Sequence, residues 1–178
     1  MYIINKHKVL LSQERKIFHA ADLALLWGIE NGNTLRTTIS RYLKSGILIS
    51  LHKGLYGTVE PSRLDQLELA RAMIHRLSYL TCESVLVSQG VIHQVLGVMT
   101  LVGEKSQSFT LPGHNIQVKV RQLAPRFLYN PLGVVSGRAD TERATADLMY
   151  YNPFYQLDSP SQINQDKLLY YQKELGYK

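Results

Sequence analysis

Side chains able to hydrogen-bond to a polyanion are concentrated between residues 33 and 53. Between Glu30 and Glu60 the sequence contains no acidic residue, so the cationic side chains there lack nearby carboxylates. Arg and Asn can pair with guanine and adenine edges, the Thr methyl contacts thymine, and Lys meets phosphate. The pattern predicts a DNA-binding segment with eight candidate residues: Asn33, Thr34, Arg36, Thr37, Ser40, Arg41, Lys44 and Lys53.

Six of these candidates fit one side of a single helix, and Arg36 lies on its flank. We expect Asn33 or Thr34 to be the N-cap of a helix that runs to Ser45 and stops at Gly46. At about 100° per residue, its apolar side chains gather on the other side, toward a core; they are Leu35, Ile39, Tyr42 and Leu43. A polar helix face is also compatible with simple solvation. Arg36, at the flank, would equally suit an ion pair with Glu30 or Asp22.

The elements around this helix predict a winged helix-turn-helix. Helical spacing links Ile3, Ile4, His7, Leu10 and Leu11, and a second helix fits residues 20–27, ended by Gly28. After the third helix, two apolar runs at residues 47–51 and 55–59 are separated by a Lys-Gly turn, which is typical of a β-hairpin. Lys53 is expected at its tip, where it could reach a groove or the backbone of bound DNA.

Other chemistry finds little support. The histidines are scattered and show no metal-ligand spacing; they are His7, His19, His52, His75, His93 and His114. Glu142 and Asp147 stand five residues apart, which separates them around a helix, and Asp140 or Thr141 would cap that helix. Nucleophile-elbow and phosphate-loop motifs are missing. We therefore expect a chain that is not an enzyme, with no metal and no cofactor.

Composition indicates a folded protein with a basic balance. The 178 residues are 45% hydrophobic and 19% charged, and 20 Lys plus Arg against 14 Asp plus Glu give a net charge of +6, which suits a polyanionic partner. Cys82, the only cysteine, excludes an intramolecular disulfide and is expected to be a partly buried thiol. The longest nearly apolar run, residues 23–29, is too short to span a bilayer. We expect a soluble, cytoplasmic protein.

The remainder of the chain predicts a small α+β domain. We expect helices over residues 64–77, 82–89, 141–151 and 164–175, and strands over residues 98–102, 108–111 and 116–120. Six tyrosines near the C-terminal end suit core packing or a subunit interface; they are Tyr150, Tyr151, Tyr155, Tyr170, Tyr171 and Tyr177. With residues 60–62 as a linker, the fold class is α+β in two domains, residues 1–60 and 61–178.

Three segments resemble the AbiE-type antitoxin family of type IV toxin–antitoxin systems. Residues 35–48, with Asp22-Leu23 before them and residues 53–56 after them, are similar to that family's winged-helix start. Residues 79–92 resemble its Ser-Leu-Glu-Ser-Ala-Leu block, with Leu80-Thr81-Cys82 where Ser-Leu is usual. Residues 140–148 resemble its Thr-Pro-Glu-Lys-Ala…Asp-Leu block, with Asp140-Thr141 in place of Thr-Pro.

The resemblance implies a DNA-binding repressor of its own promoter that also counteracts a nucleotidyltransferase-like toxin of an abortive-infection system. It implies no stable toxin complex, and a homodimer is compatible with it. Two alternatives stay open: an enzyme or enzyme regulator of nucleotide metabolism with a nucleic-acid-binding module, and a ligand-sensing winged-helix regulator without a toxin.

Overall fold

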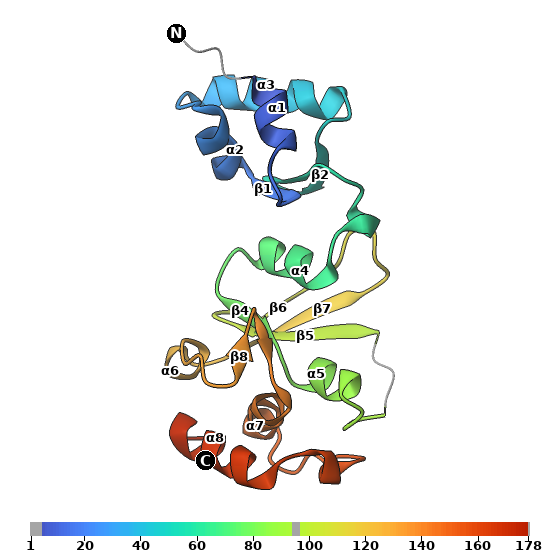
Figure 1. Ribbon diagram of the computed structural model, residues 1–178, viewed down its shortest axis with the longest axis vertical. Helices are drawn as coiled ribbons and strands as arrows, with labels where there is room; N and C mark the ends of the chain where they lie inside the picture. Colours follow the sequence, from blue (N-terminus) through green and yellow to red (C-terminus); the bar gives the residue numbers. More distant parts are fainter. Residues whose placement is uncertain (1–4, 94–96, 178) are drawn as a thin grey trace. The chain divides into compact units, whose positions relative to one another are not determined.

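The computed structural model describes residues 5–93 and 97–177, and these form two compact units. The N-terminal unit comprises the chain up to Met73 together with Pro112–His114, and the C-terminal unit comprises Ile74–Leu111 and the chain from Asn115 onward. Both units combine helices with a β-sheet (Figure 1). The chain is therefore α+β, as expected.

The N-terminal unit contains a three-stranded antiparallel sheet in the order β1-β3-β2. Its elements along the chain are α1 (Lys6–Leu11), β1 (Ile17–His19), α2 (Ala20–Trp27), α3 (Gly32–Lys44), β2 (Ile49–His52), β3 (Leu55–Gly57), the 3-10 helix η1 (Pro61–Arg63) and α4 (Gln66–Ile74). The expected second helix is confirmed: Gly28 adopts the left-handed conformation (φ 60°) that ends α2.

Sequence patterns missed strand β1. Its three residues carry no periodic signal, and β1 is a strand because its backbone pairs with β3, with Phe18 opposite Tyr56. The first helix begins at Lys6 after the N-cap Asn5, whose side chain accepts the Lys8 N–H. Ile3 and Ile4, assigned to that helix from their spacing, lie outside the described residues.

The segment expected to be a linker is packed instead. Pro61–Arg63 form η1, and the carbonyl of Pro61 lies 2.9 Å from His114 Nε2. Gly113 (φ 72°) sits so close that a Cβ there would lie 2.6 Å from the Ser62 nitrogen, so only glycine fits. The helix expected over residues 64–77 is the shorter α4, because His75 adopts a positive φ of 55° that a helix cannot continue through.

The C-terminal unit is built on a six-stranded mixed sheet in the order β6-β7-β5-β4-β9-β8. Its elements are β4 (Ser78–Leu80), α5 (Glu83–Ser88), β5 (Val98–Gly103), β6 (Gln107–Thr110), β7 (Gln117–Gln122), α6 (Pro125–Leu128), β8 (Val134–Val135), β9 (Arg138–Ala139), α7 (Thr141–Tyr151), the 3-10 helix η2 (Pro160–Gln162) and α8 (Gln165–Leu175). The three expected strands and the helices at 141–151 and 164–175 appear within one or two residues of their expected bounds.

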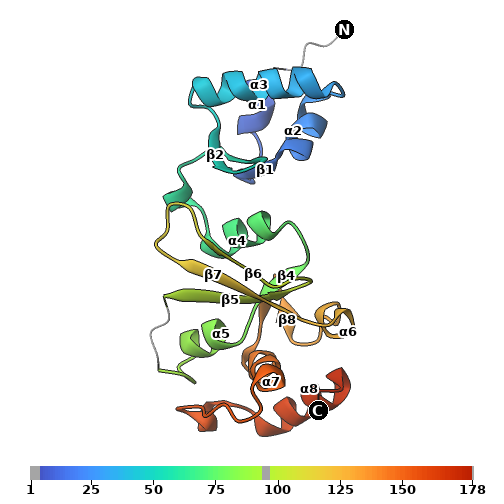
Figure 2. The same ribbon diagram turned by 180° about the vertical axis from the view of Figure 1, so that it is seen from behind.

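Both views show this unit as layers: the sheet, then α5 and α7, then α8 beyond α7 (Figures 1 and 2). Parallel pairs β5–β7 and β4–β9 alternate with antiparallel pairs across the sheet. Strands β4, β8 and β9 are short and went unassigned from the sequence. None of the helices in residues 5–93 and 97–177 combines the length and apolar character that crossing a membrane requires.

Candidate nucleic-acid interface

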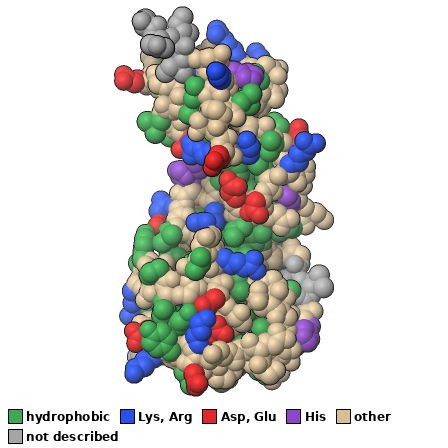
Figure 3. Space-filling model, in the orientation of Figure 1, with side chains coloured by type: hydrophobic (Ala, Val, Ile, Leu, Met, Phe, Trp, Pro, Cys, Tyr) green, Lys and Arg blue, Asp and Glu red, His purple; other side chains and the backbone are tan. Residues whose placement is uncertain are grey.

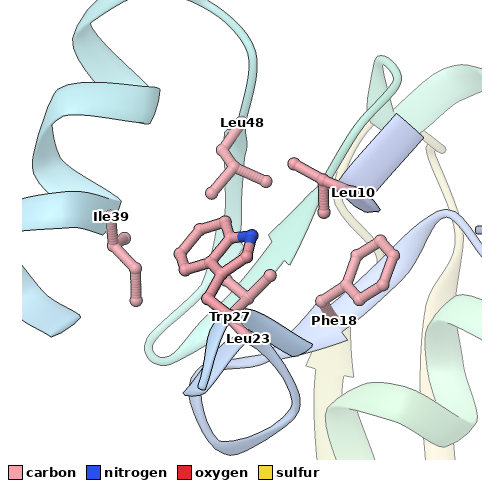
Figure 4. Packing of buried hydrophobic residues seen from close by; sticks show 6 residues of the cluster. All are labelled: Leu10, Phe18, Leu23, Trp27, Ile39 and Leu48. Atoms are coloured by element: carbon pink, nitrogen blue, oxygen red, sulfur yellow. The ribbon is translucent and has the colours of Figure 1, made fainter. Parts of the chain in front are cut away.

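Helix α3 is held by its apolar side against the core of the N-terminal unit. Ile39, 5% exposed, packs in a buried cluster with Leu10, Phe18, Leu23, Trp27 and Leu48 (Figure 4). Leu35, Tyr42 and Leu43 pack at its edge, and the Tyr42 ring lies 5.0 Å from that of Trp27. The predicted inner face of this helix is therefore confirmed, and its opposite side must face outward.

The outward side presents every α3 residue that the sequence singled out. All seven are exposed: Asn33, Thr34, Arg36, Thr37, Ser40, Arg41 and Lys44. Lys and Arg side chains are visible at the end of this unit where α3 lies (Figure 3). Arg36, Arg41 and Lys44 take no part in the ion pairs found among the described residues. Their charges are thus available to an external anion.

Arg36 forms neither of the ion pairs that its flanking position would allow, with Glu30 or with Asp22. Asp22 pairs instead with Arg15, at 3.5 Å between the guanidinium and the carboxylate. The same carboxylate accepts the His19 backbone N–H at 2.8 Å and so caps the start of α2. Arg36 therefore belongs with the other cations of the α3 surface.

The N-cap of α3 is Asn31, which corrects the expectation of Asn33 or Thr34. Its Oδ1 accepts the backbone N–H groups of Asn33 at 2.9 Å and Thr34 at 3.1 Å. The helix therefore starts earlier, at Gly32. Since Asn31 occupies these amides, the first turn offers fewer backbone donors to a phosphate than an uncapped helix would.

Two threonines on α3 use their hydroxyls locally. The Thr37 hydroxyl donates to the Asn33 carbonyl at 2.9 Å, and the Thr38 hydroxyl donates to the Thr34 carbonyl at 2.8 Å. With its hydroxyl engaged, the exposed Thr37 offers its methyl group to a partner. A methyl group suits contact with thymine.

Lys53 lies apart from the other candidates. It is exposed in the turn between β2 and β3, next to Gly54, whose carbonyl accepts the Ala20 N–H at 3.0 Å. This bond places the turn beside the start of α2, whereas α3 occupies the other end of the unit in both views (Figures 1 and 2). The structure therefore provides two separate cationic contact points, α3 and the β2–β3 turn.

A second polar cluster lies inside the C-terminal unit, and sequence reasoning missed it. Arg143 and Asp147, both fully buried, form an ion pair at 2.9 Å within α7. Asp147 also accepts the hydroxyls of Tyr79 at 2.9 Å, Thr81 at 2.8 Å and Tyr177 at 2.5 Å. The sequence signal for this ion pair was the spacing of Arg143 and Asp147, four residues apart in a predicted helix.

This buried network is a structural element. The Arg143 guanidinium donates to the backbone carbonyls of Phe127, Asn130 and Leu132 as well as to Asp147 and Tyr79. Burial and the neighbouring Asp147 carboxylate raise the pKa of Tyr79 well above its usual value. Every charged atom here is satisfied by protein, so nothing in the network is available to a substrate.

The other acidic candidates at the start of α7 both contact Lys167 of α8. Asp140 is the N-cap of α7 and accepts the Arg143 backbone N–H at 2.8 Å. It is one of the two residues, Asp140 and Thr141, that were expected to cap this helix. Glu142 pairs with Lys167 of α8 at 2.9 Å. Glu142 and Asp147 therefore do not combine into a carboxylate pair. Within the described residues no group of three or more His, Cys, Asp or Glu side chains could hold a metal ion.

Cys82 is fully buried, not partly buried as its sequence context suggested. It lies at the junction of β4 and α5 with a φ of 52°. Burial raises the pKa of its thiol well above the ordinary value, and the Asp147 carboxylate adds to the shift. A thiol in this state is a poor nucleophile, which favours a packing role.

Neither the protein-family models nor the curated proteins contain a match to this sequence.

Proposed function

We propose that the chain is a DNA-binding transcriptional repressor whose N-terminal unit is a winged helix-turn-helix. In this proposal α2 and α3 are the helix-turn-helix, α3 enters the major groove, and the β2–β3 hairpin is the wing. The observation that carries the proposal is the outer face of α3: seven exposed polar or cationic side chains on one rigidly held helix, without an acidic residue between Glu30 and Glu60.

The element order supports this assignment. In the chain order α1-β1-α2-α3-β2-β3, one strand precedes the α2–α3 pair and a hairpin follows it, and the three strands form one sheet. Residues 28–31 form the short connection between α2 and α3. The buried Trp27 and Ile39 join the two helices through one core, so α3 is fixed in orientation. A fixed helix can present Arg41 and Thr37 to defined base edges.

The second part of the proposal is that the chain is an AbiE-like antitoxin, which represses its own promoter in the cytoplasm and counteracts a nucleotidyltransferase-like toxin. Its support is the resemblance of residues 79–92 and 140–148 to that family's blocks. These two segments meet in the C-terminal unit, where Tyr79 bonds to Asp147.

A gel-shift titration with DNA from upstream of the protein's own gene tests the DNA-binding proposal. The full chain should shift this DNA in the presence of excess competitor DNA, and the affinity should fall steeply as salt is raised. Equal affinity for a scrambled fragment of the same length would show that α3 does not read sequence, and no shift at low salt would overturn the proposal.

Growth rescue tests the antitoxin role separately. A nucleotidyltransferase-like reading frame next to the gene should arrest growth when expressed alone, and co-expression of this chain should restore growth. A variant with weakened promoter binding, such as Arg41→Ala, should still rescue when both genes are driven by foreign promoters. A well-folded chain that fails to rescue would contradict the antitoxin role and leave DNA binding intact.

A further inference from the structure

The outward face of α8 carries an ordered stripe of side chains. Asp166, Leu169, Tyr170 and Lys173 follow the spacing i, i+3, i+4 and i+7, which puts them on one side of the helix. Leu169 is 62% exposed and Tyr170 is 52% exposed. The stripe therefore consists of two large apolar side chains flanked by an acidic residue at the N-terminal end and a basic residue at the C-terminal end, and the exposed Glu174 lies at its edge, one turn after Tyr170.

The opposite face of α8 is firmly attached to its own chain. Leu168, Tyr171 and Leu175 are buried, and the Tyr171 hydroxyl donates to Asp140 at 2.9 Å. Lys167 bridges Asp140 at 3.0 Å and Glu142 at 2.9 Å, both in the first turn region of α7. Because these contacts fix the helix, the outward stripe is a defined surface. Hydrophobic side chains with neighbouring charges are visible in the region of α8 (Figure 3).

The charges of the stripe are unpaired within the chain. Neither Asp166 nor Lys173 takes part in an ion pair among the described residues. A second α8 running antiparallel would place Lys173 of one copy beside Asp166 of the other, twice, with Leu169 against Tyr170 between them. A parallel arrangement would place like charges together. The four stripe positions are thus complementary to themselves in the antiparallel orientation, in which Glu174 of one copy faces the uncharged Gln165 of the other.

We propose that α8 is a homodimer interface, in which two copies of this chain pair antiparallel about a two-fold axis. The self-complementary order of charges selects a second copy as the occupant of this face. The proposal does not depend on DNA binding. If both hold, the dimer predicts an operator with two-fold symmetric half-sites.

The expected dimer is weak and reversible. Stable interfaces bury about 1,200–2,000 Å² in total. One pair of three-turn helices, with two apolar anchors per copy, supplies less area than this. The exchange between monomer and dimer should therefore occur in the micromolar range of protein concentration.

Charge reversal with mixing provides the test. Sedimentation velocity of the full chain, from low to high micromolar concentration, should show a concentration-dependent shift toward the dimer. Asp166→Lys and Lys173→Asp each replace two attractive contacts with two repulsive ones and should weaken self-association about tenfold or more. An equimolar mixture of the two variants should dimerise again, because every facing pair in the heterodimer is then attractive.

Two controls separate this result from a general charge effect or misfolding. Lys119→Asp, on the exposed side of β7, changes the net charge as Lys173→Asp does and should leave self-association unchanged. Thermal unfolding followed by circular dichroism checks that each variant is folded. A monomer at all concentrations, or folded variants that fail to associate on mixing while the wild type dimerises, would overturn the proposal.

Discussion

Arg143 and Asp147, one turn apart on α7, form an ion pair in which neither side chain has any exposed surface. Burying two charges costs several kcal/mol per ion, and this cost is offset only when every remaining hydrogen-bonding position is filled. Here the guanidinium also binds three backbone carbonyls of residues 127–132, and the carboxylate binds three hydroxyls. The pair thereby connects α7 to β4, to α6 and the segment after it, and to Tyr177.

Removing the arginine should strongly destabilise the protein. Arg143→Met leaves Asp147 as a buried charge and leaves carbonyls without donors, so we expect a loss of about 3–5 kcal/mol in the free energy of unfolding. Urea denaturation followed by circular dichroism measures it. Arg63→Ala, which removes an exposed arginine, should stay within about 0.5 kcal/mol of wild type. A change of similar size for both variants would contradict the buried role of Arg143.

Stability should fall as the pH rises above about 10. Burial, followed by the effect of Asp147, raises the pKa of Tyr177 above its ordinary value of 10.0, and the pKa of Tyr79 is raised for the same reasons. Because the tyrosine pKa is higher in the folded chain than in the unfolded chain, its contribution to stability is fully present below the pKa of the unfolded chain. This contribution is lost as the pH rises above that value. Each such tyrosine should contribute a slope of up to about 1.4 kcal/mol per pH unit.

Tyr177→Phe provides the test of this pH dependence. The variant should be less stable at neutral pH, because Asp147 loses a hydrogen bond, but its stability should decline less steeply between pH 10 and 11. Urea midpoints across this range measure the slope. Identical slopes in the wild type and the variant would show that Tyr177 titrates in the native state as it does in the unfolded chain.

Arg41 should carry sequence preference. It is exposed on the outer face of α3, so Arg41→Ala should cost about 1–3 kcal/mol with the cognate DNA and relax preference at one base position. Binding to operator and scrambled DNA, each across a salt series, measures this. Lys119→Ala removes the same charge from β7 and should leave both affinities unchanged. Equal weakening on both DNAs would mean that Arg41 meets phosphate.

Lys53 should meet the DNA backbone at a point separate from α3. Its loss should weaken binding to all sequences alike and reduce the slope of log affinity against log salt by about 1, because one counterion fewer is released. The same salt series with Lys53→Ala measures the slope. An unchanged slope would place the β2–β3 turn away from the DNA and confine the contacts to the helical side of the unit.

Local signals in the sequence determined most of the helices and the surface character of α3. Helical periodicity, the cap Asp140 and the stops at Gly28 and Gly176 each act within a few residues, so they can be recognised without the fold. The outer face of α3 was predictable for the same reason. Its seven residues share one side of a helix, and the apolar remainder of that helix has to face a core.

Tertiary pairing decided the features that depend on distant residues. β1 is a strand only because β3 lies beside it, and the short strands β4 and β9 are stabilised by pairing across the six-stranded sheet. Arg143 and Asp147 are spaced as in any exposed helical ion pair. Their burial, and that of Cys82, depends on residues 30 or more positions away in the sequence, such as Tyr79 and Tyr177, since burial is a property of the packed chain and not of local spacing.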